Sequence, residues 1–393
     1  MKNKIRVAIV GVGNCANSLY QGLTFYSGYT EGKERCGLMK DRIGNYAVSE
    51  IEVVAAFDID KRKVGQCFRD AMWAKPNCTL EFEPNVPDGP TVQMGPVLDG
   101  VASLMENYPE DEAFRISEET PVNIAEVLTE RKVDILINYL PVGSQKATEF
   151  YAKECLKSGV SFLNCIPVFI ASNPEWEQKF IDAGIPLVGD DMKSQFGASI
   201  LSQMLQELAF ARGHRVKAHI QRNVGGNTDF LNMMDQSRLK YKKVSKENVI
   251  RSQNEIHEID PETSFLHAGP SEYIAYYKDN KVANIRLEME GFMGSPVILD
   301  AQLSVIDSPN SAGVVMDAIR YLKVARELGI VGALRGPSAF TQKTPPQQLM
   351  FSETVYECEA LSDRRLTRFT EKQTSKYDAK ELYRSCPSYN KEV

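Results

Sequence analysis

Several hallmarks of membrane, secreted and zinc-stabilised proteins are missing from this 393-residue chain. No apolar run approaches the roughly 20 residues that a membrane span needs, and no signal-peptide core follows the N-terminal lysines. The eight cysteines are scattered without a CxxC pair, which argues against a disulfide framework or a structural zinc site. We therefore expect a cytoplasmic protein with reduced thiols and no membrane partner.

A basic surplus and a metal-binding histidine pattern are missing too. The net charge of -6 argues against binding to nucleic acid, which favours basic surfaces. The four histidines show no HExxH spacing, so the sequence defines no metal site and leaves a need for a divalent or monovalent cation open. The length predicts two or three structural units, and a 43% hydrophobic fraction is enough for a sizeable core.

The N-terminus has the pattern of a dinucleotide-binding loop. A β-branched run from Ile5 to Val10 predicts a strand buried on both faces. The glycines that follow would allow a tight turn and the close approach of a pyrophosphate, and the next helix would offer its N-terminal amides. A purely structural strand–turn–helix is the alternative. The loop fits GxGxx(G/A), and its candidate cofactor residues are Gly11, Gly13, Asn14, Cys15 and Ala16.

The acidic partner of this loop comes late in the chain. Ile51–Phe57 predicts the second strand and Asp58 ends it, well beyond the roughly 20 residues that usually separate loop and acid. We therefore expect an irregular insertion over Thr24–Glu50. Asp58 favours NAD over the 2′-phosphorylated cofactor. Asp60 is the weaker candidate, and either acid would also suit the cap of a helix beginning near Lys61.

Strand and helix signals then alternate, as in a doubly wound parallel sheet. Asp134–Tyr139 predicts a strand that ends at the carboxyl edge, where dinucleotides bind. A helix through Tyr151 follows, and Pro141, Ser144 and Tyr151 are candidate cofactor residues. Further strands are expected over Val160–Asn164 and Ile185–Gly189, and a proline-rich loop over Ala74–Gly100.

A dense polar cluster, Gly189–Gly197, follows the last of these strands. It places two aspartates, a lysine and a serine before a helix that we expect to start near Ala198. Helix capping alone would account for Asp and Ser at such a place. The cluster is denser than capping requires, so we interpret it as functional.

Beyond Gly213 the apolar periodicity changes. Residues 285–290 and 300–305 alternate between apolar and polar, which is typical of antiparallel strands with one wet face. The turn Asp307–Ser311 would cap a long helix that ends at Gly329 and buries Val315, Ala318, Ile319 and Leu322.

The fold class that follows is α/β, with a Rossmann-like doubly wound parallel sheet and an inserted α+β domain. We expect the dinucleotide domain over 1–212 plus about 306–348, and the inserted domain over 213–305. The charged segment 349–393 would be a C-terminal extension, with a helix on the surface or on a neighbouring subunit.

The stretch Asn223–Lys246 is the strongest candidate for a substrate site. Its first half, Asn223–Asp229, predicts a turn whose glycines bring backbone amides close to a ligand. Its second half is rich in lysine and would suit an anionic sugar, although a lysine-rich stretch taken alone is usually a solvated surface. Ser245 would cap a helix from Lys246, at the positive end where a structural lysine is disfavoured. The clustered lysines are Lys240, Lys242, Lys243 and Lys246.

Several motifs occur in one order along the chain: GVGNCANSL, GDDMKSQFG, NVGGNTDFLNM, KKVSK, IDSPNSAG and QKTPP. Through them the chain, from about Ile5 to Gln348, resembles the myo-inositol-phosphate synthases and looks most like their short bacterial branch. The resemblance implies a homotetramer in which the inserted domain serves catalysis and tetramerisation. It also implies redox-neutral conversion of glucose 6-phosphate to inositol 1-phosphate, also numbered 3-phosphate, with tightly bound NAD. The glycine-poor loop and the tail after Gln348 depart from the family pattern.

The resemblance implies roles for individual residues. Lys242 would lie nearest the C5 oxygen, Lys343 would contact the C5 oxyanion, and Asp307 would orient lysines. Lys246 and Lys281 would serve cyclisation and phosphate binding. Asp229, Asp191 and Ser194 match polar positions around nicotinamide and substrate, and we expect Lys193, Gln195, Asn223, Asn227 and Asn232 to bind substrate.

The implied chemistry needs such a cluster. Hydride leaves C5 for NAD while a base takes the C5 hydroxyl proton, the ketone acidifies C6, an enolate attacks the C1 aldehyde, and the stored hydride returns. A lysine acts as the base only if its pKa falls toward neutrality, which burial and neighbouring like charges achieve. Two rival functions remain open: an ordinary sugar-phosphate dehydrogenase that forms NADH, and a non-enzymatic sensor of NAD or a sugar phosphate.

Overall fold

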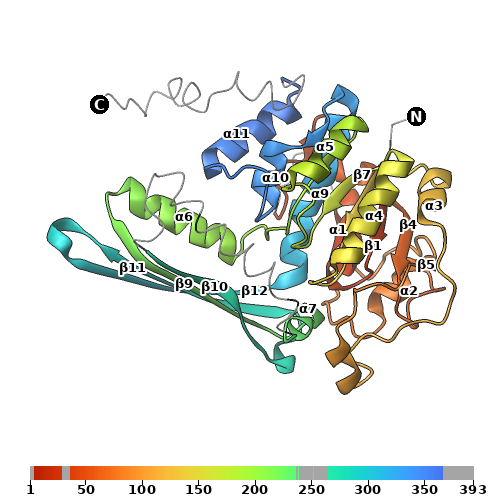
Figure 1. Ribbon diagram of the computed structural model, residues 1–393, viewed down its shortest axis with the longest axis horizontal. Helices are drawn as coiled ribbons and strands as arrows, with labels where there is room; N and C mark the ends of the chain where they lie inside the picture. The colour runs from red at the N-terminus through yellow and green to blue at the C-terminus, as the bar shows by residue number, and fades with distance from the viewer. Residues whose placement is uncertain (1–3, 29–35, 236–237, 239–250, 252–263, 366–393) are drawn as a thin grey trace.

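The computed structural model describes residues 4–28, 36–235, 238, 251 and 264–365 (Figure 1). A seven-stranded sheet, in the order β13-β8-β7-β6-β1-β4-β5, forms one half of the molecule, and every pairing in it is parallel. This confirms the predicted doubly wound α/β sheet. Its strands are β1 (Ile5–Val10), β4 (Ile51–Asp58), β5 (Val92–Met94), β6 (Ile135–Asn138), β7 (Ser161–Asn164), β8 (Pro186–Val188) and β13 (Gly332–Ala333).

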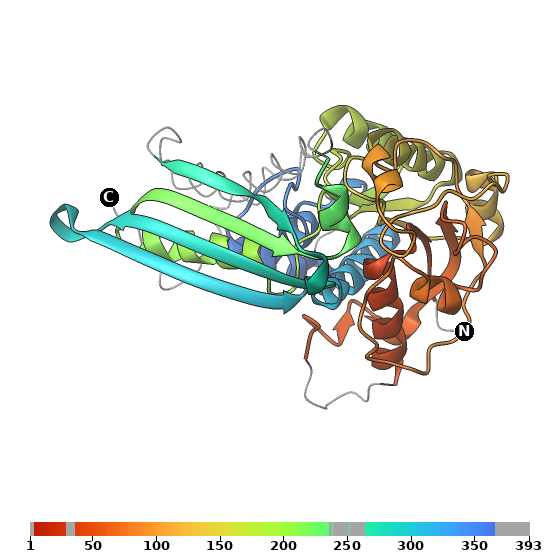
Figure 2. The ribbon, with the colours of Figure 1, turned by 90° about the horizontal axis from the view of Figure 1, so that it is seen from below.

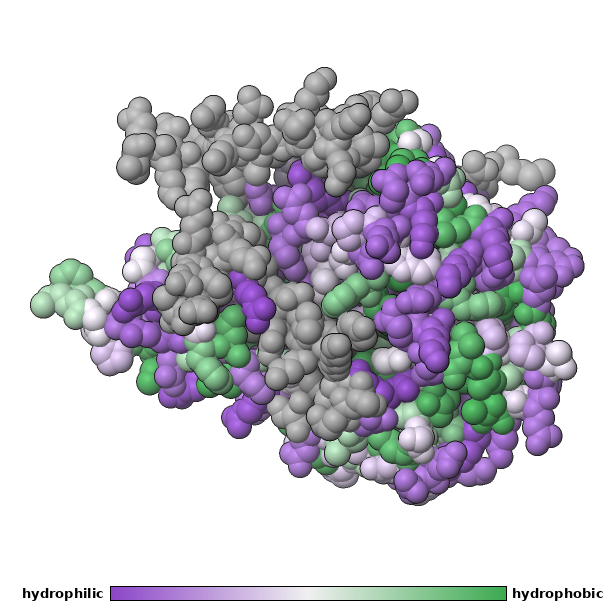
Figure 3. Space-filling view, viewed as in Figure 1, coloured by the Kyte–Doolittle hydropathy of each residue, from purple (hydrophilic) through white to green (hydrophobic). Residues whose placement is uncertain are grey.

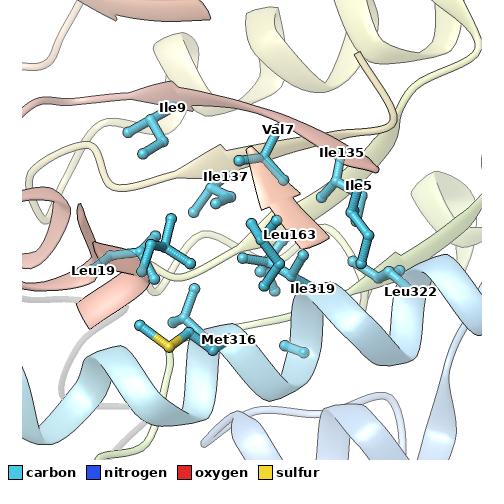
Figure 4. Close-up of a cluster of buried hydrophobic side chains, with 14 of the residues drawn as sticks. Ile5, Val7, Ile9, Leu19, Ile135, Ile137, Leu163, Met316, Ile319 and Leu322 are labelled. Atoms are coloured by element: carbon cyan, nitrogen blue, oxygen red, sulfur yellow. The ribbon is translucent and has the colours of Figure 1, made fainter. Parts of the chain in front are cut away.

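Helices cover both faces of this sheet because its strands are apolar on both sides. In β1, Ile5 and Val7 point into a core shared with α1 and α9, whereas Ala8 and Val10 join a second core with α3, α4 and α5. Figure 4 shows the first core, where Ile319 and Leu322 of α9 lie beneath the strands. The helices are α1 (Asn14–Ser27), α2 (Phe68–Trp73), α3 (Ile124–Glu130), α4 (Gln145–Ser158), α5 (Pro174–Asp182), α9 (Asp307–Leu328), α10 (Arg335–Thr341) and α11 (Phe351–Ser362).

A second sheet extends away from the first like an arm (Figures 1 and 2). Its order is β10-β9-β11-β12, and α6 (Ala198–Ala211) covers one face over Ala283, Ile285 and Leu287. The alternation predicted for its strands is confirmed in β12, but the sheet is mixed because β10 runs parallel to β9. The strands are β9 (Arg215–Gly225), β10 (Phe265–Tyr273), β11 (Asn280–Glu290) and β12 (Pro296–Ile306). The domain boundaries themselves stay a prediction.

The far end of this arm is apolar and exposed. The short turn Phe292–Gly294 joins β11 to β12, and Phe292 and Met293 are 86% and 89% exposed. Figure 3 shows the tip of the arm in pale green, the colour of apolar residues. Exposed apolar residues of this size are typical of contact surfaces.

Some predicted irregular segments are ordered differently. The supposed loop Ala74–Gly100 contains β5, whose three residues pair with β4 and are too short to show a period in the sequence. Helix α1 continues to Ser27, so the insertion predicted from Thr24 begins later and contains a small hairpin, β2 (Arg42–Ile43) and β3 (Tyr46–Ala47). Turns, not a helix, follow Asp60.

The C-terminal part of the described chain differs from the prediction of a surface helix. Helix α11 buries Cys358 and Leu361 in the same core as α9. One of its charged side chains, Glu357, is buried and pairs with Arg335 of α10 inside the fold, so charge in this segment does not mark an exposed surface. Residues 366–393 lie outside the described residues. Within the described part of the chain, no helix is both long and apolar enough to cross a membrane.

Helix α9 is the long helix that the sequence predicts, with Gly329 as its left-handed C-cap. The four residues expected on its buried face are all fully buried: Val315, Ala318, Ile319 and Leu322. The helix begins at Asp307 itself, so the segment 307–311 is its first turn and not a separate turn before it.

Candidate active site

A pocket lies where the carboxyl ends of the parallel strands meet the second sheet. Its walls come from the glycine loop, the loops after β6, β7 and β8, the short helix α7 (Thr228–Asn232), and the start of α9. Many residues singled out in the sequence meet here: Gly13, Asn14, Cys15, Pro141, Asp191, Ser194, Asn223, Asn227, Asp229, Lys281, Asp307 and Lys343.

The glycine loop has two glycines with different environments. Gly11 has φ +88°, and a Cβ there would lie 2.6 Å from the backbone oxygen of Tyr139. Gly13 has φ -96°, and a Cβ there would meet no atom within 4 Å. The first glycine is therefore required by the fold, while the second borders open space that a ligand can approach.

Asp58 lies beside this loop as the sequence predicts. Its carboxylate accepts hydrogen bonds from the Val12 amide at 2.7 Å and from the amides of Ile59 and Asp60. Together with Gly11, Gly13 and Tyr151, Asp58 lines a second pocket that adjoins the first. Burial and the Asp58 charge raise the pKa of Tyr151, so its hydroxyl stays protonated.

Some predicted cofactor residues have contacts within the protein, although Asn14 and Cys15 also line the main pocket. Ala16 is fully buried in the core. The Asn14 amide oxygen accepts from the Cys78 amide at 2.8 Å, and the Ser144 hydroxyl donates to the Pro141 carbonyl at 2.5 Å. Cys15 lines the pocket, and burial with nearby aspartates raises its pKa to about 12, so it is a neutral thiol.

Lys63 is a site residue that the sequence analysis missed. Its side chain is fully buried in the second pocket, and Nζ donates to the Val12 carbonyl at 2.8 Å and to Asn77 at 3.1 Å. The Asn77 amide also donates to the Val12 carbonyl. These two side chains hold the glycine loop from behind. No motif in the sequence indicates them because they act on the backbone.

Among the residues that the structure describes, two lysine–carboxylate pairs line the main pocket. The Lys281 ammonium, at the start of β11, forms a salt bridge with the carboxylate of Asp307, the first residue of α9. Lys343 donates to Asp191 Oδ1 at 3.0 Å and to the Met192 carbonyl at 2.8 Å. Lysine and carboxylate thus meet from segments far apart in the chain.

Backbone bonds fix the second of these pairs in place. The Lys343 amide donates to the Asp191 carbonyl at 2.7 Å, and the Thr344 amide donates to the Asp190 carbonyl at 2.9 Å. Asp190 itself is completely buried, and the amides of Ile170 and Ser172 donate to its carboxylate. The two adjacent aspartates therefore have different roles. Asp190 anchors the loop, and Asp191 lines the pocket.

The predicted turn Asn223–Asp229 is wrong in its first three residues, which end strand β9. Its glycines serve packing of the protein itself. A Cβ on Gly225 would meet the Phe230 ring at 2.5 Å, and a Cβ on Gly226 would meet the Ile274 carbonyl at 2.3 Å. The close approach that we assigned to a ligand is made by protein atoms.

Three predicted substrate residues lie behind the pocket wall. Lys193 is buried and Nζ donates to the Ala339 carbonyl at 2.8 Å, and burial lowers its pKa to about 8. The backbone amide of Gln195 donates to the Asn310 carbonyl, and the Asn232 side chain donates to the Val142 carbonyl. None of them belongs to the pocket lining among the described residues. The clustered lysines and their expected cap, Lys240, Lys242, Lys243, Lys246 and Ser245, lie outside the described residues.

Asp279 is a second missed residue. Its carboxylate lies behind the wall of the main pocket and is 2% exposed. Its neighbours Ser308 and Asn227 line the pocket. In the described part of the chain, no group of three or more His, Cys, Asp or Glu side chains is arranged to hold a metal ion.

The chain is similar to known proteins in both sequence and fold. A family model described as myo-inositol-1-phosphate synthase matches residues 197–308. An inositol-3-phosphate synthase of Mycobacterium tuberculosis is 45% identical over 346 residues, which is 88% of this chain and 92% of that protein. One from Corynebacterium glutamicum is 46% identical over 349 residues, with 88% and 94% covered.

The fold comparison agrees. A crystal structure of a myo-inositol-1-phosphate synthase-related protein from Thermotoga maritima superposes with a TM-score of 0.75, covering 91% of this chain and 98% of that one. The two sequences are 22% identical, so this likeness supports the fold alone.

Proposed function

This chain belongs to the myo-inositol-1-phosphate synthase family, and we propose that it converts glucose 6-phosphate to inositol 3-phosphate with NAD and without net oxidation. One observation supports the proposal above the others. A single pocket joins a dinucleotide loop to two lysine–carboxylate pairs. A simple dehydrogenase needs the loop, whereas a cyclisation also needs groups that move protons and stabilise an oxyanion.

The residues around the glycine loop fit NAD. Helix α1 has no side-chain cap and no acidic residue in its first turn, so its amides are suited to a pyrophosphate. Gly13 leaves room for that approach, and Asp58, which lines the adjoining pocket, would accept hydrogen bonds from the ribose hydroxyls. When bound, NAD would accept hydride from the sugar and return it later in the cycle.

The Lys343–Asp191 pair would act on the C5 oxygen of the sugar. The Asp191 and Met192 amides donate to the carbonyls of Ile166 and Cys165, which places the pair just beyond the ends of β7 and β8. Dinucleotides lie along that edge of the sheet. The Lys343 ammonium would stabilise negative charge on the C5 oxygen as its proton leaves, and Asp191 would hold the ammonium in position.

The Lys281–Asp307 pair would act at the other end of the substrate. It belongs to the second sheet and the start of α9, and Asn223, Asn227 and Asp229 line the same part of the pocket. An ammonium here suits the substrate phosphate and the enolate oxygen. The protons of the C5 hydroxyl and of C6 would be removed with the help of the clustered lysines, with Lys242 nearest the C5 oxygen and Lys246 serving cyclisation, as the family resemblance implies.

We also propose how the protein assembles and where it is located. We expect a cytoplasmic homotetramer, formed through the second sheet. The exposed large apolar residues of this sheet favour such contacts, and they include Phe265, Phe292, Met293 and Ile298.

The test is an incubation of the purified protein with glucose 6-phosphate and NAD. NADH absorbance and phosphate ester that resists alkaline sugar degradation are measured in the same tube. We expect the resistant ester without NADH accumulation. NADH that rises with turnover, without a cyclitol, would mean a dehydrogenase. No signal in either channel, with cations supplied, would favour a sensor.

A further inference from the structure

Asp279 lies at a junction of three elements around the active site. It precedes β11 by one residue, and its side chain is buried between the starts of α7 and α9. Oδ1 accepts hydrogen bonds from the Ser308 hydroxyl at 2.7 Å and from the Asn227 amide at 3.3 Å. Oδ2 accepts from the Ser308 backbone amide at 3.3 Å.

These bonds supply a cap that α9 lacks. The N-cap residue of α9 is Ile306, which has no side-chain oxygen for the first amides of the helix. The carboxylate of Asp279 takes that role from another element. Asn227, which caps α7 through the amides of Asp229 and Phe230, is tied to the same carboxylate.

The backbone of Asp279 extends this link to the reacting groups. Its carbonyl accepts from the Asp307 amide at 2.8 Å, and Lys281 follows two residues later in the chain. Asp279 therefore contacts one member of the Lys281–Asp307 pair directly and holds the strand end that presents the other.

A cap alone does not require a buried carboxylate. Ser, Thr and Asn cap helices about as well as Asp, without a charge to desolvate. Asp279 lies beside a second carboxylate, and burial together with the Asp307 charge raises the pKa of Asp279 to about 6. Such an unfavourable placement is typical of functional sites.

We propose that Asp279 is a positioning residue, which holds the Lys281–Asp307 pair in its reactive geometry by joining the starts of β11, α7 and α9. This role rests on the proposed function of the pocket. A misplacement of about 1 Å can lower a rate on the order of 100-fold, so the contacts of Asp279 should affect turnover more than cofactor affinity.

The experiment compares wild type with Asp279→Ala and Asp279→Asn as full-length proteins. We expect kcat for inositol phosphate to fall about 100-fold in D279A and about 10-fold in D279N, which keeps one acceptor oxygen. The Kd for NADH, followed by its fluorescence, should stay within about twofold because the glycine loop is untouched. In a Lys281→Met background, D279A should add less than a factor of about two, because coupled residues are not additive.

Asn173→Ala is the matched control. Asn173 caps α5 through the amides of Glu175 and Trp176, and it does not line the pocket among the described residues. It should lower the melting temperature in the way that D279A does, with kcat unchanged. D279A with a lower melting temperature and an unchanged kcat would overturn the role of Asp279. A parallel fall of kcat and NADH affinity would overturn it as well. An inactive wild type would instead refute the proposed function, and the positioning role with it.

Discussion

Two alanine substitutions in the glycine loop separate the needs of the fold from the needs of the cofactor. Gly11→Ala places a Cβ at φ +88° and 2.6 Å from the Tyr139 carbonyl oxygen, a backbone atom held by the sheet. Gly13→Ala places a Cβ at φ -96° in open space. We expect G11A to destabilise the protein and G13A to block the pyrophosphate of NAD.

The magnitudes follow from these surroundings. A left-handed conformation costs a non-glycine residue roughly 1–2 kcal/mol, and relief of the Tyr139 contact adds to that cost in G11A. In G13A the fold should be unchanged or up to about 1 kcal/mol more stable, because alanine has less freedom in the unfolded chain. Loss of one charge-assisted hydrogen bond to the pyrophosphate costs roughly 1.5–3 kcal/mol, which weakens NAD binding by a factor of about 10–150.

The assay needs protein from which bound NAD has been removed. Thermal unfolding gives the stability of each variant, and calorimetric titration with NAD gives the Kd. G13A with the melting temperature of wild type and a raised Kd would support the reasoning. G13A that binds NAD within twofold of wild type would show that the pyrophosphate lies elsewhere, and the assignment of the loop would then be wrong.

Three other predictions concern ionisable side chains. Lys281→Met and Lys343→Met should each lower kcat for inositol phosphate about 100- to 1000-fold while the Kd for NAD stays within about twofold, because each ammonium is assigned to transition-state charge. Burial lowers the pKa of His219 to about 4, whereas an unfolded histidine titrates near 6.5. The neutral His219 therefore contributes stability above pH 6.5 that is lost as pH falls toward 4, about 2 kcal/mol of it by pH 5. Between pH 7 and pH 5, the free energy of unfolding measured in urea should change by about 2 kcal/mol more unfavourably in wild type than in His219→Gln, which is the difference that isolates His219 from the buried carboxyls that titrate in the same range. Arg320→Met should lower the free energy of unfolding by about 3–5 kcal/mol, because Arg320 and Asp317 are both fully buried as an ion pair; a loss below 1 kcal/mol would refute this.

The parallel sheet could be predicted because its signals are local. The run Ile5–Val10 is apolar except for Arg6, and the loop that follows fits the spacing GxGxx(G/A). The four core residues predicted in α9 could be found because Val315, Ala318, Ile319 and Leu322 recur at helical spacing. That spacing does not show that the helix is buried on all sides over residues 311–322. Strand β5 could not, because three residues contain too little pattern.

The site residues divide in the same way. Lys343 belongs to the motif QKTPP, Asp58 was predicted from the strand that it ends, and Lys281 follows from the family resemblance. All three line pockets of the structure. Lys63 and Asp279 could not be identified because they act on backbone groups from distant segments, and such contacts exist only once the chain is folded. Lys193 shows the opposite error. It lies within a motif, yet its side chain turns inward to the Ala339 carbonyl. Residues close in sequence on one loop can thus point either into the pocket or into the protein interior behind it.

Helix α9 connects the two separate sheets and can hold the groups that they present to the pocket at a fixed distance. Its middle turns are buried under β1 and β6, where Ile319 and Leu322 pack in the core of Figure 4. Its first residue, Asp307, holds Lys281 of the second sheet. A helix in a close-packed core moves as a rigid unit, because the tight packing around it resists a shift. We therefore expect α9 to help fix the distance between the dinucleotide loop and Lys281. On this reasoning, a cavity made within its core, as in Ile319→Ala, should lower stability by about 2–5 kcal/mol. It should also lower kcat more than it raises the Kd for NAD.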